Sequence, residues 1–170
     1  SGTLDAKVML EDTLGMALCY PESSTAAVLC DDGLYLIDRS GESEHTLTIA
    51  SSDLISLTSH DNMLAIATRS YSGNARSDLY TVRGSTLSGP YALAEEPSAL
   101  AISAAGTAVL SSSGVTVYDT SFQPKWHNTE AVGARRVLLT DDGTVCALYT
   151  KNARLFTAHS EHSEEVTNAN

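Results

Sequence analysis

The chain is poor in basic residues. Its 170 residues include 10 Lys and Arg against 21 Asp and Glu, which gives a formal net charge of −11. A surface with this charge repels phosphate groups, and the longest basic cluster, Arg135-Arg136, is too short to offset it. The composition therefore disfavours binding to nucleic acids and to anionic membrane surfaces.

Long hydrophobic runs and helical patterns are also missing. No stretch approaches the roughly 20 apolar residues that cross a bilayer, so we predict no membrane insertion of this segment. Apolar residues nowhere keep the i, i+3, i+4, i+7 spacing of an amphipathic helix. Short apolar runs instead alternate with clusters of Ser, Gly, Asp and Asn, which is typical of an all-β sandwich, barrel or repeat array.

Cysteine is scarce. The 3 cysteines include no C-x-x-C pair and are too few for a disulfide framework. Cys19 and Cys30 flank a predicted hairpin with its midpoint between Ser24 and Thr25, a register that would place them opposite each other and within disulfide reach. Two alternatives stay open: a disulfide, which would point to an extracytoplasmic protein, or two buried free thiols.

A repeat of about 40 residues runs through the chain. Each unit begins with an apolar strand, a polar turn and a second apolar strand, at residues 17–30, 55–68, 100–112 and 136–149. A third strand follows at residues 33–38, 78–83, 114–119 and 153–157. A weaker, more polar fourth strand follows at residues 44–49, 90–93, 124–128 and 164–168. Four strands per unit of this length are typical of β-propeller blades.

The residue pattern of the repeat resembles that of a known family. The segment RVLLTDDGTVCALYTKNARLFT (136–157) is similar to the blade motif of bacterial quinoprotein-like and WD40-like propellers. The Gly-His and Trp-Asp signatures of WD40 repeats and the Trp ladder of quinone-cofactor propellers are absent. The resemblance implies an all-β fold of four propeller-like blades and supplies no catalytic residue. We predict an N-terminal arm at residues 1–15 and blades at about 16–52, 53–97, 98–133 and 134–168.

Four blades are few for a closed propeller. One possibility is that a strand at residues 5–11 joins the last blade and closes the ring. The other is that the chain is half or another fragment of a seven- or eight-bladed propeller, with a blade face exposed at each end. A second copy would cover both faces by two-fold pairing. The expected partner is therefore another protein or a second copy in a homodimer.

The string Asp-Asp-Gly occurs at residues 31–33 and 141–143. It lacks the alternating oxygen donors of a calcium loop, and it suits a tight turn in which Gly supplies a positive φ. His159 and His162, beside Glu161, could hold a metal weakly, but their polar surroundings favour a solvated tail. We predict no metal site, no cofactor and no catalytic residues, because the chain also lacks a P-loop and a G-x-S-x-G elbow.

The loop at residues 69–78 interrupts the repeat. It is polar and carries Arg69, Tyr71, Asn74 and Arg76 on an otherwise acidic protein. Insertions of this kind often line a binding face, although a tolerated surface insertion is the alternative. We predict a non-catalytic binding or scaffolding module for protein–protein interaction in a bacterial extracytoplasmic protein. The alternatives are a cytoplasmic location, and a small-ligand-binding or hydrolytic propeller that uses its central channel.

Overall fold

The computed structural model describes residues 7–10 and 12–158, which form four antiparallel sheets. The first contains β1 (Gly15–Glu22), β2 (Thr25–Cys30), β3 (Gly33–Asp38) and β4 (Ser43–Thr48). The second contains β5 (Leu54–His60), β6 (Met63–Arg69), β7 (Ser77–Arg83) and β8 (Thr86–Leu93). The third contains β9 (Ala99–Ser103), β10 (Gly106–Ser111), β11 (Gly114–Tyr118) and β12 (Pro124–Asn128). The fourth contains β13 (Arg136–Leu139), β14 (Val145–Leu148) and β15 (Ala153–Phe156).

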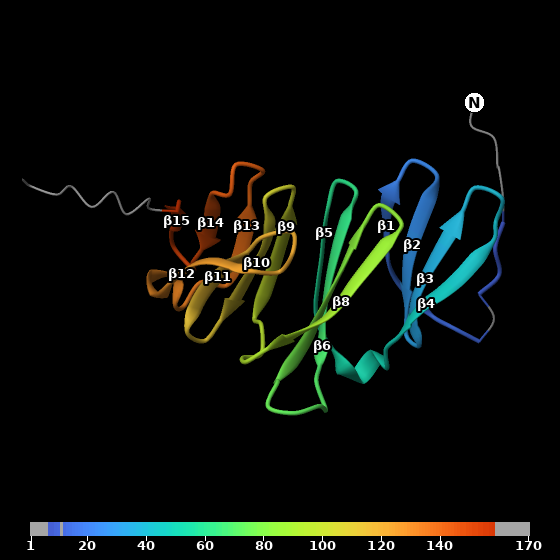
Figure 1. Cartoon of the computed structure of the whole chain (residues 1–170), viewed down its shortest axis with the longest axis horizontal. Coiled ribbons are helices and arrows are strands. Elements are labelled where there is room, and N and C mark those ends of the chain that lie inside the picture. The colour runs from blue at the N-terminus through green and yellow to red at the C-terminus, as the bar shows by residue number, and fades with distance from the viewer. Residues whose placement is uncertain (1–6, 11, 159–170) are drawn as a thin grey trace, which may run out of the picture.

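Each sheet is a meander, because its strands pair in chain order. The four sheets stand side by side, also in chain order, and the first and last lie at opposite ends of the row (Figure 1). This confirms the predicted all-β, propeller-like architecture, in the form of an open arc. The fourth strand predicted at residues 164–168 lies outside the described residues, as do His159 and His162.

Two 3-10 turns, η1 (Ser51–Asp53) and η2 (Thr129–Ala131), are the helices of the described residues. Within that part of the chain, neither has the length or hydrophobicity to cross a bilayer.

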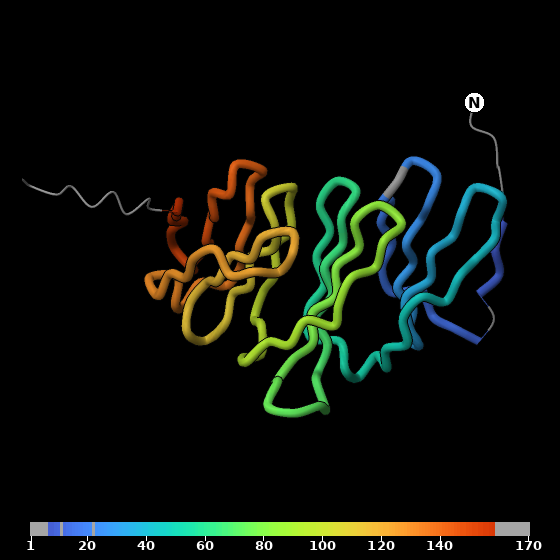
Figure 2. The backbone as a smooth tube through the Cα atoms, in the orientation of Figure 1, coloured from blue at the N-terminus to red at the C-terminus, as the bar shows by residue number. Residues whose placement is uncertain are grey.

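The N-terminal segment runs beside the first sheet (Figure 2). Residues 7–10 form no strand, and Val8 borders the same surface hollow as Tyr20 and Ile37. For these residues, the alternative in which the N-terminal segment joins the last sheet and closes a four-bladed ring is wrong. The described part of the segment lies beside the sheet that directly follows it, at the end of the arc opposite the last sheet.

Three apolar layers hold neighbouring sheets together. Cys19, Ala27 and Leu29 of the first sheet pack with Leu64 and Ile66 of the second. The second and third sheets share a layer that contains Ala65, Leu79, Leu100, Ile102 and Val109. The third and fourth share a layer that contains Ala108, Leu110, Val117, Val137, Val145 and Phe156. Strands of an interior sheet are therefore apolar on both faces, since each face is covered by a neighbour.

The second Asp-Asp-Gly string forms the β13–β14 turn, as predicted. Asp142 accepts hydrogen bonds from the Thr140 hydroxyl and the Thr144 amide, and these bonds lower the pKa of its carboxyl group. Gly143 supplies a positive φ of 87°. Asp141 has a role that the sequence did not reveal: it accepts a hydrogen bond of 3.0 Å from the amide of Ala104 in the third sheet. The first residue of the string therefore links two sheets.

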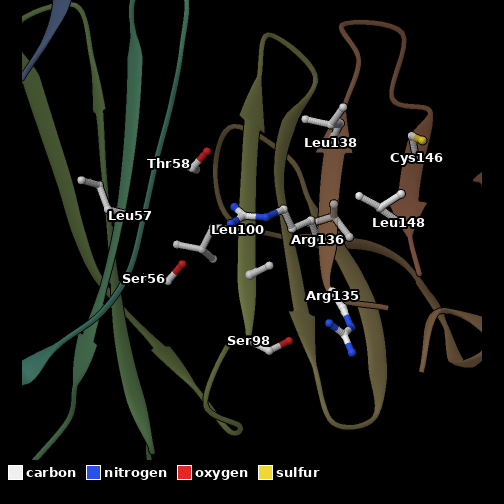
Figure 3. Close-up of a pocket in the computed structure, with 12 residues that line it drawn as sticks. Ser56, Leu57, Thr58, Ser98, Leu100, Arg135, Arg136, Leu138, Cys146 and Leu148 are labelled. Carbon is white, nitrogen blue, oxygen red and sulfur yellow. The ribbon is translucent and has the colours of Figure 1, made fainter. Parts of the chain in front are cut away.

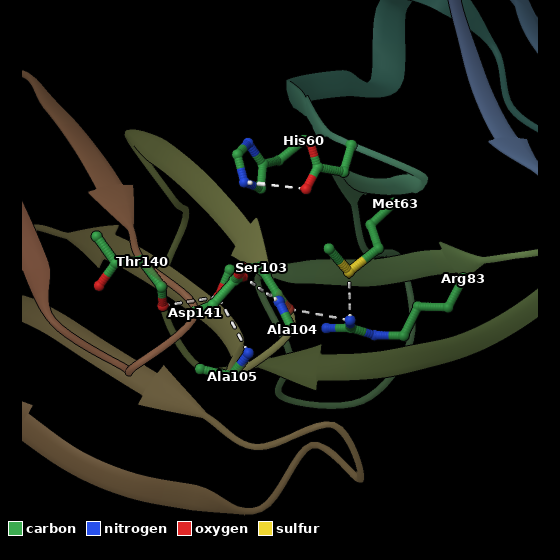
Figure 4. A network of polar contacts seen from close by, with 9 residues as sticks. His60, Met63, Arg83, Ser103, Ala104, Ala105, Thr140 and Asp141 are labelled. Carbon is green, nitrogen blue, oxygen red and sulfur yellow. Dashed lines mark hydrogen bonds and ion pairs between the residues drawn. The ribbon is translucent and has the colours of Figure 1, made fainter.

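Polar contacts at one edge of the arc tie the second, third and fourth sheets together (Figure 4). The guanidinium of Arg83, at the end of β7, donates to the carbonyls of Ser103 (3.0 Å) and Gly106 (3.1 Å). The Ser103 hydroxyl donates to the Thr140 carbonyl at 3.0 Å. Since these partners are mostly backbone atoms of strand ends and turns, they fix each hairpin relative to the next.

A carboxylate in the connection between β8 and β9 is held by the turn between β10 and β11. Glu95 accepts hydrogen bonds from the Ser112 hydroxyl at 2.8 Å and the Ser113 amide at 3.2 Å. These bonds lower its pKa from 4.5 to about 2. The charged form is therefore the one that stabilises the fold, and its contribution is complete above pH 4.5 and lost as the pH falls toward 2.

We expect Glu95→Gln to remove this pH dependence. Between pH 4.5 and 2, the free energy of unfolding of the unmodified chain should fall more steeply than that of the variant. Urea unfolding at a series of pH values measures both slopes, and Glu96→Gln, at the exposed neighbouring residue, is the matched control. Equal slopes for the unmodified chain and Glu95→Gln would contradict the prediction.

Candidate interaction surfaces

The predicted binding residues lie together on the loop between β6 and β7, which projects beyond the sheets (Figure 2). Arg69, Tyr71, Asn74 and Arg76 are all exposed. The loop is closed at its base, because the Ser70 amide donates to the Arg76 carbonyl at 3.2 Å. It is also anchored to its sheet by a 2.9 Å bond from the Arg76 amide to the Leu93 carbonyl.

Tyr71 is tethered although its ring is 77% exposed. Its hydroxyl donates to Asp53 of η1 at 2.6 Å, and this bond raises the pKa of the Tyr71 hydroxyl, against the opposing effect of Arg69. A hollow of about 370 Å³ lies between the loop and the connection at residues 48–53. An aromatic ring held in place at the rim of a hollow loses little conformational freedom on binding a partner.

A larger hollow of about 640 Å³ crosses β5, β9 and β13, the first strands of three successive sheets (Figure 3). Its lining contains Arg135 and Arg136, several hydroxyls and apolar side chains such as Leu57 and Leu100. The lining includes no Asp, Glu or His from the described residues. Nor do those residues contain a group of three or more His, Cys, Asp or Glu that could hold a metal ion.

The predicted cysteine register is wrong. Cys19 pairs with Ala27, and Cys30 pairs with Gly15, so the two cysteines lie on different rows of the hairpin. Ala27 and Cys30 are an odd number of positions apart on β2, which places their side chains on opposite faces of the sheet. Both thiols are free and buried, and burial raises the pKa of Cys19. The geometry thus supports the second of the two alternatives, buried free thiols.

The first sheet has an open face, which we call the N-terminal face. Pairing aligns Leu18, Val28, Tyr35 and His45 in one row across β1, β2, β3 and β4, on the side away from the second sheet. Met16, Leu18 and Tyr20 of β1 are exposed on this side, Leu18 to 59%. Tyr35 stacks on His45 with ring centroids 4.6 Å apart, and its hydroxyl donates to Asp32 at 2.6 Å.

The fourth sheet has an open face at the other end, the C-terminal face. Leu138, Cys146 and Leu155 form one row across β13, β14 and β15, and Arg136, Leu148 and Ala153 form the next. Leu138 is 68% exposed and Leu155 is 73% exposed, while Val137 and Ala147 on the other side are buried against the third sheet. The row therefore presents leucines to solvent in a position that would be covered in an interior sheet.

The open rows carry little charge. Asp38 and Glu44 of the first sheet share rows with Thr25 and Leu36, on the side that faces the second sheet. Arg154 shares a row with Ala147 on the covered side of the fourth sheet, and Arg136 lines the hollow that also contains Leu100.

The sequence contains a signal for both faces. The stretch MALCY in β1 and the stretch VLL in β13 are apolar at successive positions, so each strand presents apolar side chains to both sides of its sheet. Such continuous runs are typical of strands buried on both faces. In the terminal sheets one of those faces has no neighbouring sheet within the described arc.

Comparison with known proteins gives the fold and no more. No family model matches the chain, and no curated protein matches it. The structure of BBS1N in complex with ARL6DN has a TM-score of 0.55 at 14% identity, over 87% of this chain and 53% of that one. The computationally designed Ika4 protein has a TM-score of 0.54 at 14% identity, over 94% of this chain and 99% of that one.

A bacterial structure shares the same architecture. The extracellular domain of the one-component system BT4673 from B. thetaiotaomicron has a TM-score of 0.50 at 15% identity, over 85% of this chain and 21% of that one. The chain thus resembles propeller-type domains at the level of architecture, which confirms the predicted resemblance. It spans about half the length of the BBS1N chain, at 53%.

Proposed function

We propose that the chain is a non-catalytic protein-interaction module that docks through its N-terminal and C-terminal faces. The observation that carries this proposal is that both outward faces have the apolar character of the faces buried between sheets. Leu18, Leu138 and Leu155 are all more than half exposed. Contiguous exposed apolar patches on a folded domain mark sites of protein interaction. A protein partner or a second copy of the chain covers them.

The β6–β7 loop adds a second contact surface to this proposal. Tyr71 is exposed yet held by Asp53, and Arg69 lies beside it. Tyr and Arg are enriched among the residues that dominate binding energy at protein interfaces. We place Arg69, Tyr71, Asn74 and Arg76 in this surface. The partner bound to BBS1N and the extracellular domain of BT4673 support a protein-binding role in a bacterial extracytoplasmic protein.

A second candidate function is binding of a small anionic ligand in the concave hollow. Arg135 and Arg136 line it together with leucine side chains, and within the described residues neither arginine has a carboxylate partner. In a chain with a net charge of −11, arginines that stay unpaired in a hollow favour an anion with an apolar body.

The docking proposal is tested with the thiol of Cys146, which lies between Leu138 and Leu155 on the C-terminal face. The other two thiols are buried. In an extract of cells that make the natural protein, we expect a thiol reagent to label Cys146 at least 10-fold more slowly than in the dilute purified chain. Leu155→Glu should restore fast labelling, and Cys146→Ser shows which signal belongs to this thiol. Labelling at equal rates in extract and in dilute solution would show that nothing covers the face.

A further inference from the structure

We infer that the protein that covers both faces is a second copy of this chain, docked head to tail. The C-terminal face of each copy packs on the N-terminal face of the other, and the two arcs close one ring. This inference rests on the proposed docking function and names its partner. Three features of the structure lead to it: the sense of the interior junctions, the composition of the rows and the number of sheets.

Every interior junction of the arc is formed in the same sense. The side of a sheet that faces the C-terminal end packs on the side of the next sheet that faces the N-terminal end. A head-to-tail contact between copies repeats this sense at the end of the arc. A contact between two like faces would need an arrangement that the arc uses nowhere among its described sheets.

The exposed rows occupy the strand positions of buried rows. In the third sheet, pairing aligns Ala101, Ala108 and Val117 across the first three strands, and the fourth sheet covers this row. In the fourth sheet, the row at the first three strands is Leu138, Cys146 and Leu155. Both rows are free of charge, which makes the C-terminal face a further copy of an interior junction surface.

The N-terminal face provides the complementary half of that junction. Leu18, Val28 and Tyr35 occupy the first, second and third strands, where the fourth sheet has Leu139, Val145 and Phe156 on its covered side. Those three residues of the fourth sheet are buried. Each terminal face thus has no described sheet that covers it, and the opposite terminal face of a second copy could cover it.

The number of sheets indicates that two copies of the chain form the ring. Closed propellers typically have four to eight blades, and two copies of a four-sheet arc supply eight. Three copies would exceed that range. A heterologous contact of this kind makes a ring when its rotation closes and a filament when it does not. The arc also corresponds to about half of a longer propeller-type chain, at 53% of BBS1N.

Light scattering of the purified chain and two face variants tests the inference. We expect a mass twice the 17.9 kDa of one chain. Leu18→Arg on the N-terminal face and Leu155→Glu on the C-terminal face should each lower the association constant at least 100-fold, because every interface in a homodimer contains one altered face. Val132→Glu, at another exposed apolar residue, is the matched control and should leave the dimer intact. Circular dichroism checks that each variant is folded.

Mixing the two variants separates head-to-tail docking from other geometries. In the mixed dimer one interface is unaltered, and the other sets the introduced guanidinium of one variant against the introduced carboxylate of the other. We therefore expect association at least 10-fold tighter than for either variant alone.

If only one variant dissociates the dimer, like faces dock with each other. The head-to-tail inference then fails, while the docking proposal stands. A monomer at all concentrations rejects the second copy, and protection of Cys146 in extracts then still reports on the docking proposal. A mass that grows without limit rejects ring closure.

Discussion

Gly106→Ala is expected to lower the free energy of unfolding by about 4 kcal/mol, enough to unfold much of a marginally stable chain. Gly106 opens β10 with a φ of 143°, which side chains with a Cβ rarely adopt. A Cβ atom there would lie 1.9 Å from the Tyr118 carbonyl oxygen and 3.1 Å from the Asp119 Cα. These are backbone atoms of the paired strand and its end, so relief of the clash requires β10 and β11 to separate.

Two other glycines supply the controls for this prediction. Gly73 has a φ of 62° but nothing within 4 Å of an added Cβ, so Gly73→Ala should cost only the roughly 1–2 kcal/mol of left-handed backbone strain. Gly15 has neither feature, and Gly15→Ala should be close to neutral. Urea unfolding of the three variants gives the ranking. A loss for Gly106→Ala no larger than that for Gly73→Ala would show that close approach of the strands is not what Gly106 provides.

The repeat of strands was readable from the sequence because it depends on local chemistry. Short apolar runs and turn residues such as Gly143 fix where a strand ends, and each of these signals spans only a few residues. The predicted third strand at residues 33–38 and fourth strand at residues 124–128 coincide with β3 and β12. The number of sheets follows from these local signals alone.

Two differences shift the register of the first hairpin: its turn is centred between Ser23 and Ser24, one position before the predicted midpoint, and a bulge follows in β1. Between Cys19 and Glu22 the strand β1 advances three positions, while its partner moves only from Ala27 to Thr25. Pro21 lies in this irregular segment, on an edge strand of the sheet. Proline lacks the amide hydrogen that regular pairing needs, so it is tolerated at edges and bulges. Counting from the predicted midpoint misplaced Cys19 because the turn lies one position earlier and because the count assumes regular pairing.

The candidate surfaces depend on which faces find a neighbour, and that is a property of the whole arc. The chain gives β13 apolar residues on both sides, as it does for β6, yet only β6 has a sheet on each side. No local pattern distinguishes a covered face from an open one when both are apolar. The sequence therefore predicted the blades, whereas the exposed rows of Leu18 and Leu138 became visible only once the sheets were arranged in space.

Arg83→Ala is expected to lower the free energy of unfolding by about 3 kcal/mol, the value of two hydrogen bonds from a charged donor. The guanidinium of Arg83 leaves the second sheet and donates to two carbonyls of the third sheet, one on each side of the β9–β10 turn. Burial lowers the pKa of Arg83, and these carbonyls satisfy donors that are partly removed from water. Without the guanidinium, two carbonyls at the junction lose their donors.

Two further substitutions at Arg83 separate the contribution of the guanidinium from that of its stem. Arg83→Met keeps the apolar stem and should recover less than half of the loss, and Arg83→Lys should fall between Met and the native residue, because one ammonium group cannot span both carbonyls. Arg39→Ala is the control: Arg39 donates to the exposed Ser23 carbonyl, and its loss should cost below about 1 kcal/mol. Urea unfolding measures the stability of all four variants, and full recovery by Arg83→Met would contradict the prediction.

Because Arg83 joins the two middle sheets, its loss should also make the curvature of the arc less fixed. Arg83→Ala should therefore weaken dimerisation although it lies on neither terminal face.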